Sequence, residues 1–305
     1  MKKTLLIVDI YAFLFRSYYA INPMHGNNGV NVNAVYGTIK ALFSIFENVQ
    51  HTNVILALDG GSRGVRHEIF PQYKANRIEC PKDLIPQFDI LDNFLNSMGI
   101  VNIRINGFEA DDIINTYTKI AKLNNMNVVI ATYDKDLMQL VCDEVCIYNQ
   151  KTKSFIHHDN VVENFNVKPH QITDYLALTG DMVDNIPGVF GVGPKKASFL
   201  LSRYKNIHEI YENIDKIENE SLKTFLINGK ESAFLSFKLA TLMLTCNVND
   251  PHDFYIYPKF TTSLLKDNFF NLCDEYNMNS IMKNLKLEIS NKGDINTLSQ
   301  GSLFI

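Results

Sequence analysis

Three apolar segments in the first half of the chain each lead into an aspartate. The segments and their acids are Thr4–Asp9, Val54–Asp59, and Val128–Thr132 with Asp134 two residues beyond. Apolar residues between them recur at helical spacing, so that strands and helices alternate. This alternation predicts an α/β fold with a mostly parallel central sheet flanked by helices. Because the carboxyl ends of parallel strands lie at one edge, the three acids are expected to meet there.

The other predicted elements continue this alternation and then end it. We expect helices in 33–50, 81–98 and 108–123, and a further strand in 101–105. After residue 168 the pattern becomes helical, with helices expected in 169–180, 194–204 and 233–244. The predicted organisation is an α/β core in 1–168, a helical region in 169–287 and a flexible polar tail in 288–305.

Composition excludes several classes of protein. The 305 residues are 46% hydrophobic and 20% charged, and no apolar run is long enough to suggest a membrane span. Lys2 and Lys3 precede an apolar run that Asp9 interrupts early, which favours a first strand over a signal peptide. Five cysteines without zinc-site spacing indicate reduced thiols in a cytoplasmic protein.

The charge balance depends on where the charges lie. A net charge of −4 and a pI of about 6.1 do not by themselves suggest a nucleic-acid partner. A dense carboxylate cluster, however, lowers the pI without touching a binding face. Residues 63–82 contain five Lys or Arg against two Glu, which makes this long connection the best candidate for a local positive face.

The stretch Leu178–Ala197 combines two carboxylates with a glycine-rich turn. Asp181 and Asp184 are spaced i, i+3, so on a helix they would share one face and reach one hard cation together. Turn residues follow at Pro187, Gly188, Gly191 and Gly193, and Lys195-Lys196 opens the next helix. A helix, a hairpin and a helix that starts with lysines offer N–H groups and positive charge to a phosphate.

Nine carboxylates are candidate metal ligands: Asp9, Asp59, Glu109, Asp111, Asp112, Asp134, Asp136, Asp181 and Asp184. Taken singly, the acids at 109–112 would also suit a helix start, and those at 134 and 136 a capped turn. Asp9 is harder to explain in this way, because an unpaired carboxylate in a buried strand is costly. Oxygen ligands favour Mg²⁺ or Mn²⁺ over zinc, and two such ions about 3.5–4 Å apart support phosphodiester hydrolysis.

Seven motifs resemble, in order and spacing, those of the 5′-nuclease family, which comprises the N-terminal domain of bacterial DNA polymerase I and the flap endonucleases. The motifs are Leu6–Asp9, Leu56–Asp59, Arg66–Glu68, Tyr73–Arg77, Gly107–Asp112, Asp134–Asp136 and Leu178–Ala197. A late run, 269–285, is similar to the closing helices of the family, so the resemblance covers residues 4–287. It implies a PIN-like α/β fold with a C-terminal helix-hairpin-helix region.

The resemblance also implies roles for individual residues. Asp9, Asp59, Glu109 and Asp111 would dominate a first metal site, and Asp134, Asp136, Asp181 and Asp184 would shape a second. A helical arch at about 63–82, with Arg66, would lie above the metals and place Lys74 and Arg77 at the scissile phosphate and Tyr73 on a base. Arg16 would meet another phosphate. Gly191, Gly193, Lys195 and Lys196 would hold the duplex backbone, with a potassium ion at the hairpin.

Two positions depart from the family pattern. Ile10 stands where glycine commonly follows the first aspartate, and Tyr133 stands where a small residue usually precedes Asp134. Neither change removes a ligand, so we expect altered packing or rate rather than loss of activity.

The function implied by the resemblance is a structure-specific 5′-nuclease of replication and repair that trims 5′ ends and removes flaps, including RNA primers. The competing hypothesis is a non-catalytic DNA-structure binder, which the loss of metal acids would favour, and none is missing. We expect a cytoplasmic, nucleoid-associated monomer, stand-alone because no polymerase domain follows, although a fragment would look the same.

The tail supplies one more hypothesis. Gln300, Leu303 and Phe304 form a segment that resembles the short motif by which replication proteins dock on the sliding clamp. The two apolar residues would fill a pocket and the glutamine would bind at its rim. The alternative is a frayed C-terminus that happens to end in apolar residues.

Overall fold

A six-stranded sheet forms the centre of the molecule, in a computed structural model that describes residues 2–61, 63–248 and 257–285. The strand order is β3-β2-β1-β4-β5-β6. The strands are β1 (Thr4–Asp9), β2 (Asn53–Leu58), β3 (Val101–Arg104), β4 (Asn127–Ala131), β5 (Val145–Asn149) and β6 (Ser154–Ile156). The first five are parallel and β6 is an antiparallel edge strand, so the predicted mostly parallel sheet is confirmed.

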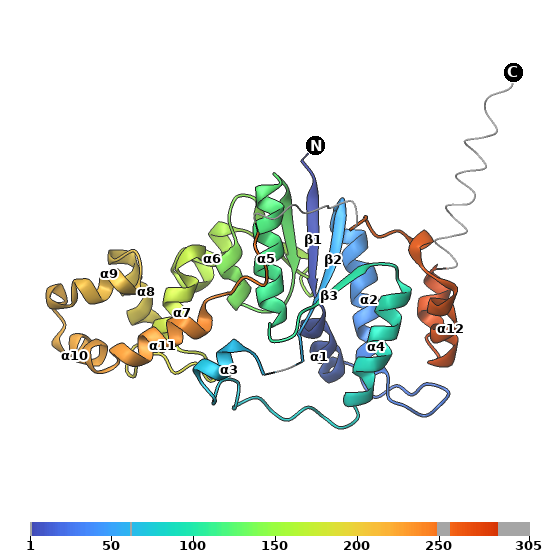
Figure 1. Ribbon diagram of the computed structural model, residues 1–305, viewed down its shortest axis with the longest axis horizontal. Helices are drawn as coiled ribbons and strands as arrows, with labels where there is room; N and C mark the ends of the chain where they lie inside the picture. Colours follow the sequence, from blue (N-terminus) through green and yellow to red (C-terminus); the bar gives the residue numbers. More distant parts are fainter. Residues whose placement is uncertain (1, 62, 249–256, 286–305) are drawn as a thin grey trace, which may run out of the picture.

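Helices cover both faces of the sheet, which explains why its central strands are apolar throughout. Leu5 and Ile7 of β1 pack on the face covered by α5 (Ala110–Leu123), whereas Leu6 and Val8 pack on the opposite face. That second face is covered by α1 (Ile10–Ala20), α2 (Asn33–Asn48) and α4 (Ile85–Ser97), as Figure 1 shows. The burial of every residue of β2 follows from this double cover.

The N-termini of two helices hold acids at the carboxyl edge of the sheet. The β1 strand passes into α1 without a loop, and Asp9 caps that helix by accepting a hydrogen bond from the Ala12 N–H at 3.4 Å. Asp59, one residue beyond β2, accepts a bond of 2.7 Å from the N–H of Ala110, the first residue of α5. Acids are stabilised at helix N-termini, because the helix dipole and unpaired N–H groups face them there.

The second half is helical, as predicted. It contains α6 (His158–Phe165), α7 (Ile172–Thr179), α8 (Pro194–Arg203), α9 (Ile207–Glu212), α10 (Glu220–Asn228) and α11 (Lys230–Ala240). The α7 and α8 helices pack together around a glycine-rich connection, and α11 packs along α7. This is the expected helix-hairpin-helix arrangement, and Figure 1 shows it extending to one side of the sheet.

The closing segment returns to the sheet. In α12 (Asp267–Glu275), the ring of Phe269 lies 6.0 Å from Phe43 of α2 and 5.5 Å from Phe94 of α4. This part of the predicted helical region therefore packs with the α/β core, on the far side from α8 (Figure 1). The predicted tail, 288–305, lies outside the described residues.

The remaining points concern the predicted arch, two further strands and membrane spans. Of the predicted helical arch in 63–82, only α3 (Val65–Ile69) is helical, and turns follow it. The strands β5 and β6 were not predicted. Within the described ranges, we find no helix long and apolar enough to cross a membrane.

Candidate active site

Five of the predicted ligands line one cavity of about 150 Å³ at the carboxyl edge of the sheet. They are Asp9, Asp59, Glu109, Asp111 and Asp134. They reach it from the end of β1, the residue after β2, the start of α5 and the loop after β4. Lys74 and Arg77 line the same cavity. The structure thus brings together side chains that lie as much as 125 positions apart, from Asp9 to Asp134.

The carboxylates of this cavity repel one another. Burial raises the pKa of Asp9 to about 7, and the charges of Asp59 and Asp134 act in the same direction against a hydrogen bond from Thr132. Burial and the charges of Asp134 and Asp9 also raise the pKa of Asp111 well above its ordinary value. For Asp136, burial and the charges of Asp134 and Asp181 raise the pKa to about 8. Such a cluster binds cations, because a cation removes the repulsion.

The donor set fits a hard divalent ion. All the lining acids offer carboxylate oxygen, and Asp136 Oδ1 is buried without a hydrogen-bond partner among the described residues. The carboxylates are not yet converged: in the described ranges, no three acidic, histidine or cysteine side chains are grouped to hold an ion. Asp59 is turned toward the Ala110 N–H, and Asp9 Oδ2 accepts a 2.7 Å bond from the Thr132 hydroxyl. Ion binding would therefore require side-chain rotation at this edge.

Two basic side chains, Lys74 and Arg77, pair with acids at the open side of the cavity. Lys74 Nζ donates to Glu109 Oε1 and lies 3.9 Å from Asp184 Oδ2. Arg77 Nη2 lies 2.7 Å from Asp184 Oδ1 and donates to it. The backbone of Lys74 has φ of 59°, an uncommon conformation for a non-glycine residue. These cations are placed beside the acids as the sequence predicted, although on a turn rather than on a helix.

A second group of acids lies next to this cavity. Asp181 and Asp184 do not share a helical face as predicted, because residues 181–186 form a turn closed by mutual backbone bonds between Asp181 and Ile186. Asp181 Oδ2 pairs with Lys135 Nζ at 2.8 Å. The charge of Asp184 acts on both Asp134 and Asp136, so the turn faces the loop after β4.

Asp112 and Arg66 do not have the roles predicted for them. Asp112 is fully buried, and its two oxygens accept bonds of 2.8 and 2.7 Å from the Arg66 guanidinium. The same carboxylate also accepts from the Met243 N–H. Arg66 further donates to the carbonyls of Leu239 and Thr241. Asp112 is therefore not placed to bind a metal, nor Arg66 to bind DNA. The pair joins α3 and α5 to the end of α11 and the segment after it.

Tyr73 is also wrongly predicted as a base-stacking residue. It is only 4% exposed, and its hydroxyl donates toward Glu109 Oε2 at 3.1 Å and Asp184 Oδ2 at 3.3 Å. Its ring packs edge-on to His67. A buried ring cannot stack on a nucleobase, so Tyr73 positions two acids instead.

The two departures from the family pattern have structural explanations. Tyr133 packs 5.0 Å from Phe13 and stacks beneath the guanidinium of Arg16, whose Cζ lies 4.2 Å from the ring centre. Ile10 is fully buried in the core as the first residue of α1. Tyr133 thus holds Arg16 at the edge of the site, and whether Arg16 meets a phosphate stays a prediction.

The predicted phosphate clamp lies on the exposed connection between α7 and α8. Gly191 has φ of +78°, and a Cβ there would come within 2.7 Å of the Phe225 ring. Lys196 Nζ donates to the Gly191 carbonyl at 2.7 Å. Gly193 caps α8, and Lys195 is exposed in the first turn of that helix. The clamp is well formed, and its contact with DNA stays a prediction.

Two site residues were missed from the sequence. Thr132 binds Asp9 with its hydroxyl and accepts a 2.9 Å bond from the Asp134 N–H, so it links two acids. Lys135 neutralises Asp181. The available signals were a threonine at the end of an apolar strand and a lysine between two acids, in Thr132 to Asp136.

Comparisons of sequence and of structure both find that this chain is similar to 5′-exonucleases. The 5′-3′ exonuclease N-terminal resolvase-like domain matches residues 4–166, and the 5′-3′ exonuclease C-terminal SAM fold matches residues 167–261. A 5′-3′ exonuclease of Buchnera aphidicola is 35% identical over 246 residues, covering 78% of this chain and 86% of the relative. DNA polymerase I of Borreliella burgdorferi is 34% identical over 99% of this chain and 33% of its own length. A structure of T5 5′-exonuclease with bound zinc is 26% identical with a TM-score of 0.64, covering 79% of this chain and 90% of that one.

The fold and the acid-lined edge define a metal-dependent nuclease with a resolvase-like α/β domain and a helical SAM-like region. More narrowly, the chain belongs to the 5′-3′ exonuclease family. Catalysis is supported over the non-catalytic alternative, because the relatives are named exonucleases and the acids of the cavity are present.

Proposed function

We propose that the protein hydrolyses phosphodiester bonds at 5′ ends, at flaps and at RNA–DNA primer junctions, with two Mg²⁺ or Mn²⁺ ions. The observation that carries this proposal is that five carboxylates, together with Lys74 and Arg77, line one cavity. Eight of the nine predicted acids, all except Asp112, would supply the ligands. When bound, the ions activate water and offset the charge that develops on the phosphate.

The residues of the chain have separate roles in this proposal. Lys74 and Arg77 now neutralise Glu109 and Asp184. In the presence of bound cations, the two side chains would be free to turn toward the scissile phosphate and stabilise its developing charge. Tyr73 and Thr132 hold the acids in place through their hydroxyl groups.

The hairpin would hold the duplex away from the cut. Gly191, Gly193, Lys195 and Lys196 present N–H groups and charge at the start of α8, and a potassium ion at the hairpin would add to them. We keep 1–168 as the nuclease core and 169–248 as the DNA-binding region, and assign 257–285 to the core because α12 packs there.

Other parts of the proposal concern partners and location. A sliding clamp would bind Gln300, Leu303 and Phe304, which lie outside the described residues. The protein would act as a monomer in the cytoplasm, associated with the nucleoid.

The test is cleavage of a 5′-labelled flap duplex with and without Mg²⁺, followed by mapping of the products. We expect cuts at the junction and at the 5′ end that chelation abolishes. Products unchanged by chelation, or a protein that binds the flap without cutting it, would contradict the proposal.

A further inference from the structure

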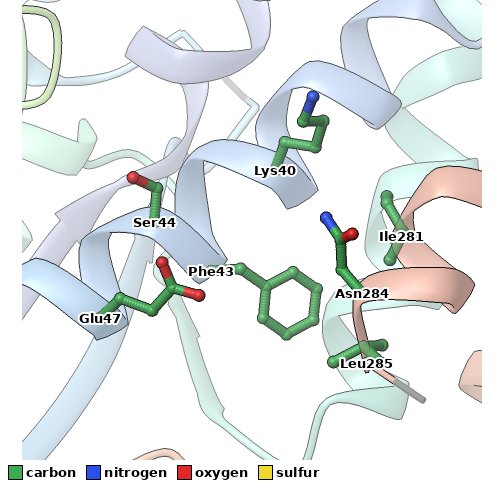
Figure 2. Close-up of a pocket in the computed structure, with 7 residues that line it drawn as sticks. All are labelled: Lys40, Phe43, Ser44, Glu47, Ile281, Asn284 and Leu285. Carbon is green, nitrogen blue, oxygen red and sulfur yellow. The ribbon is translucent and has the colours of Figure 1, made fainter. Parts of the chain in front are cut away.

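The ring of Phe190 is the most exposed aromatic side chain among the described residues. It is 87% exposed and lies in the turn of the hairpin between α7 and α8. Other rings have apolar neighbours to cover them: Phe43, although it lines an open cavity of about 250 Å³, faces Ile281 and Leu285 across that cavity (Figure 2). A single exposed ring needs no explanation by itself, so the surroundings of Phe190 decide what it can bind.

The hairpin is fixed to the helices behind it, and this holds Phe190 outward. Val189 before the ring and Val192 after it are buried. The Gly188 N–H donates to the Ser236 hydroxyl of α11 at 2.9 Å. Because the turn cannot carry the ring inward without breaking these contacts, Phe190 is presented to a partner with little loss of conformational freedom on binding.

Phe225 of α10 supports the same turn. Its ring lies edge-on to that of Phe190, with 6.0 Å between the ring centres, and Lys196 Nζ lies 4.9 Å from the centre of the Phe225 ring. A Cβ at Gly191 would come within 2.7 Å of the Phe225 ring, so the turn approaches as closely as glycine allows. The exposed ring of Phe190 and the ammonium group of Lys196 are therefore held by one aromatic side chain.

The chain around Phe190 is basic, although the protein as a whole has a net charge of −4. Between Asp184 and Glu209 there is no acidic residue. The same interval contains four Lys or Arg, which are Lys195, Lys196, Arg203 and Lys205. The two lysines lie in the first turn of α8, where unpaired N–H groups also favour an anion. The charge of this face is thus complementary to a nucleic-acid backbone.

We propose that Phe190 enters the minor groove of the duplex that the hairpin holds and lies against the sugars and base edges there. This inference rests on the proposed function, in which Lys195 and Lys196 bind the backbone of that duplex. The minor groove of B-DNA is about 6 Å wide, so a ring beside one row of phosphates fills it, whereas the major groove, about 12 Å wide, would leave the ring in water.

The minor groove also gives this contact a base preference. The amino group of guanine projects into the minor groove, whereas A·T pairs place only acceptor atoms there. A phenyl ring therefore enters more deeply where the groove lacks that amino group. Phe190 is thus a specificity-determining contact that favours A·T-rich duplex at a distance from the cut.

The test is equilibrium binding of fluorescent duplexes of equal length in EDTA, where no metal-dependent cleavage occurs. Wild type should bind an A·T-rich duplex about threefold more tightly than a G·C-rich one. An inosine–cytosine duplex, which lacks the guanine amino group, should bind like the A·T-rich one. Phe190→Ser should bind the A·T-rich duplex about tenfold more weakly and lose the preference, whereas Phe190→Leu should keep part of both.

Two controls separate the ring from charge and from general effects of substitution. Phe190→Ser should leave the salt dependence of binding unchanged, because an apolar contact releases no counterions, whereas Lys195→Ala should lower it. Leu123→Ser, at a side chain that is 61% exposed at the far end of α5, should change neither the affinity nor the salt dependence.

The outcomes distinguish this inference from the proposed function. Equal binding by Phe190→Ser and wild type, or a wild type without base preference, would remove Phe190 from the groove and leave the proposed function intact. A lower salt dependence in Phe190→Ser would show that the ring acts through the lysines, which also contradicts the groove contact. If wild type does not bind duplex at all, the proposed role of the hairpin fails and this inference with it.

Discussion

Asp111 and Asp112 are neighbours in the first turn of α5, yet they belong to two different environments. Asp112 is enclosed by Arg66, with both oxygens hydrogen-bonded and no exposed surface. Asp111 turns about 100° away around the helix and faces the charges of Asp134 and Asp9. Its pKa is raised, because burial and those charges all oppose ionisation.

The difference shows how the same side chain becomes structural or functional. A carboxylate that is paired with a cation inside the fold, as Asp112 is, stays buried and helps to hold the surrounding elements together. A carboxylate left among others of the same charge lowers the stability of the ion-free protein, and it needs a cation from outside. The two environments can be separated by experiment.

The largest effect should come from Asp111. Replacing it by alanine is expected to lower flap cleavage by at least about a thousandfold, because it removes a ligand from the cavity. The melting temperature without metal should be unchanged or higher, since repulsion is relieved. Asp215→Ala, at a carboxylate that is almost fully exposed, is the control and should cut normally. Full cleavage by Asp111→Ala would remove this residue from the site.

Arg66 should give the next largest effect, and on stability rather than chemistry. Arg66→Met leaves Asp112 buried and unpaired, so the free energy of unfolding in urea should fall by about 3–5 kcal/mol. The double variant Arg66→Met/Asp112→Leu should regain most of that loss. If Arg66→Met is as stable as Arg203→Ala, a change at an exposed arginine, the pair is not the structural element that its geometry indicates.

Asp9 should make the stability of the metal-free protein depend on pH. Its pKa is raised from 3.8 to about 7, so the folded state keeps a proton that the unfolded chain releases. The contribution of Asp9 to stability should therefore fall by about 2–4 kcal/mol as pH rises from about 4 to about 7, and level off above that. Urea unfolding in EDTA measures it, and Asp9→Asn should make the slope less steep, while the raised pKa values of Asp111 and Asp136 leave the remainder. A slope of the opposite sign would refute the buried-carboxylate account.

The smallest effects should separate two lysines. Lys74→Ala should slow cleavage more than it weakens duplex binding, because its partner is the reacting phosphate. Lys195→Ala should weaken binding a few-fold and reduce the salt dependence of binding by about one charge, with little change in the rate at saturation. Titration at several salt concentrations and single-turnover rates distinguish them. Identical behaviour of the two variants would mean that their roles are wrongly assigned.

Much of the fold was predictable because its signals are local. The β1, β2 and β4 strands are short apolar runs, and α2 has a clear helical period, so their bounds were predicted to within two residues. The β5 and β6 strands were not predicted because β5 has only five residues, and β6 has only three and is largely exposed. Their pairing comes from contacts with β4 and with each other rather than from their own composition.

The site was predictable as a cluster but not residue by residue. Position at strand ends brought Asp9, Asp59 and Asp134 together. Nothing local separates Asp111 from Asp112, since the difference depends on an arginine 46 positions from Asp112. The burial of Tyr73 has the same origin, because the turn around Asp184 that covers it belongs to the other half of the chain.

The return of α12 to the core has a consequence for synthesis on the ribosome. Phe43 and Phe94 gain Phe269 as a neighbour only after translation has passed the end of α12 at Glu275. By then every acid of the cavity has long since emerged. The growing chain thus carries a complete set of catalytic groups on a sheet whose second face still lacks its last cover, and it exposes aromatic surface to chaperones and to aggregation. Completion of the sheet's second face is therefore tied to the translation of α12.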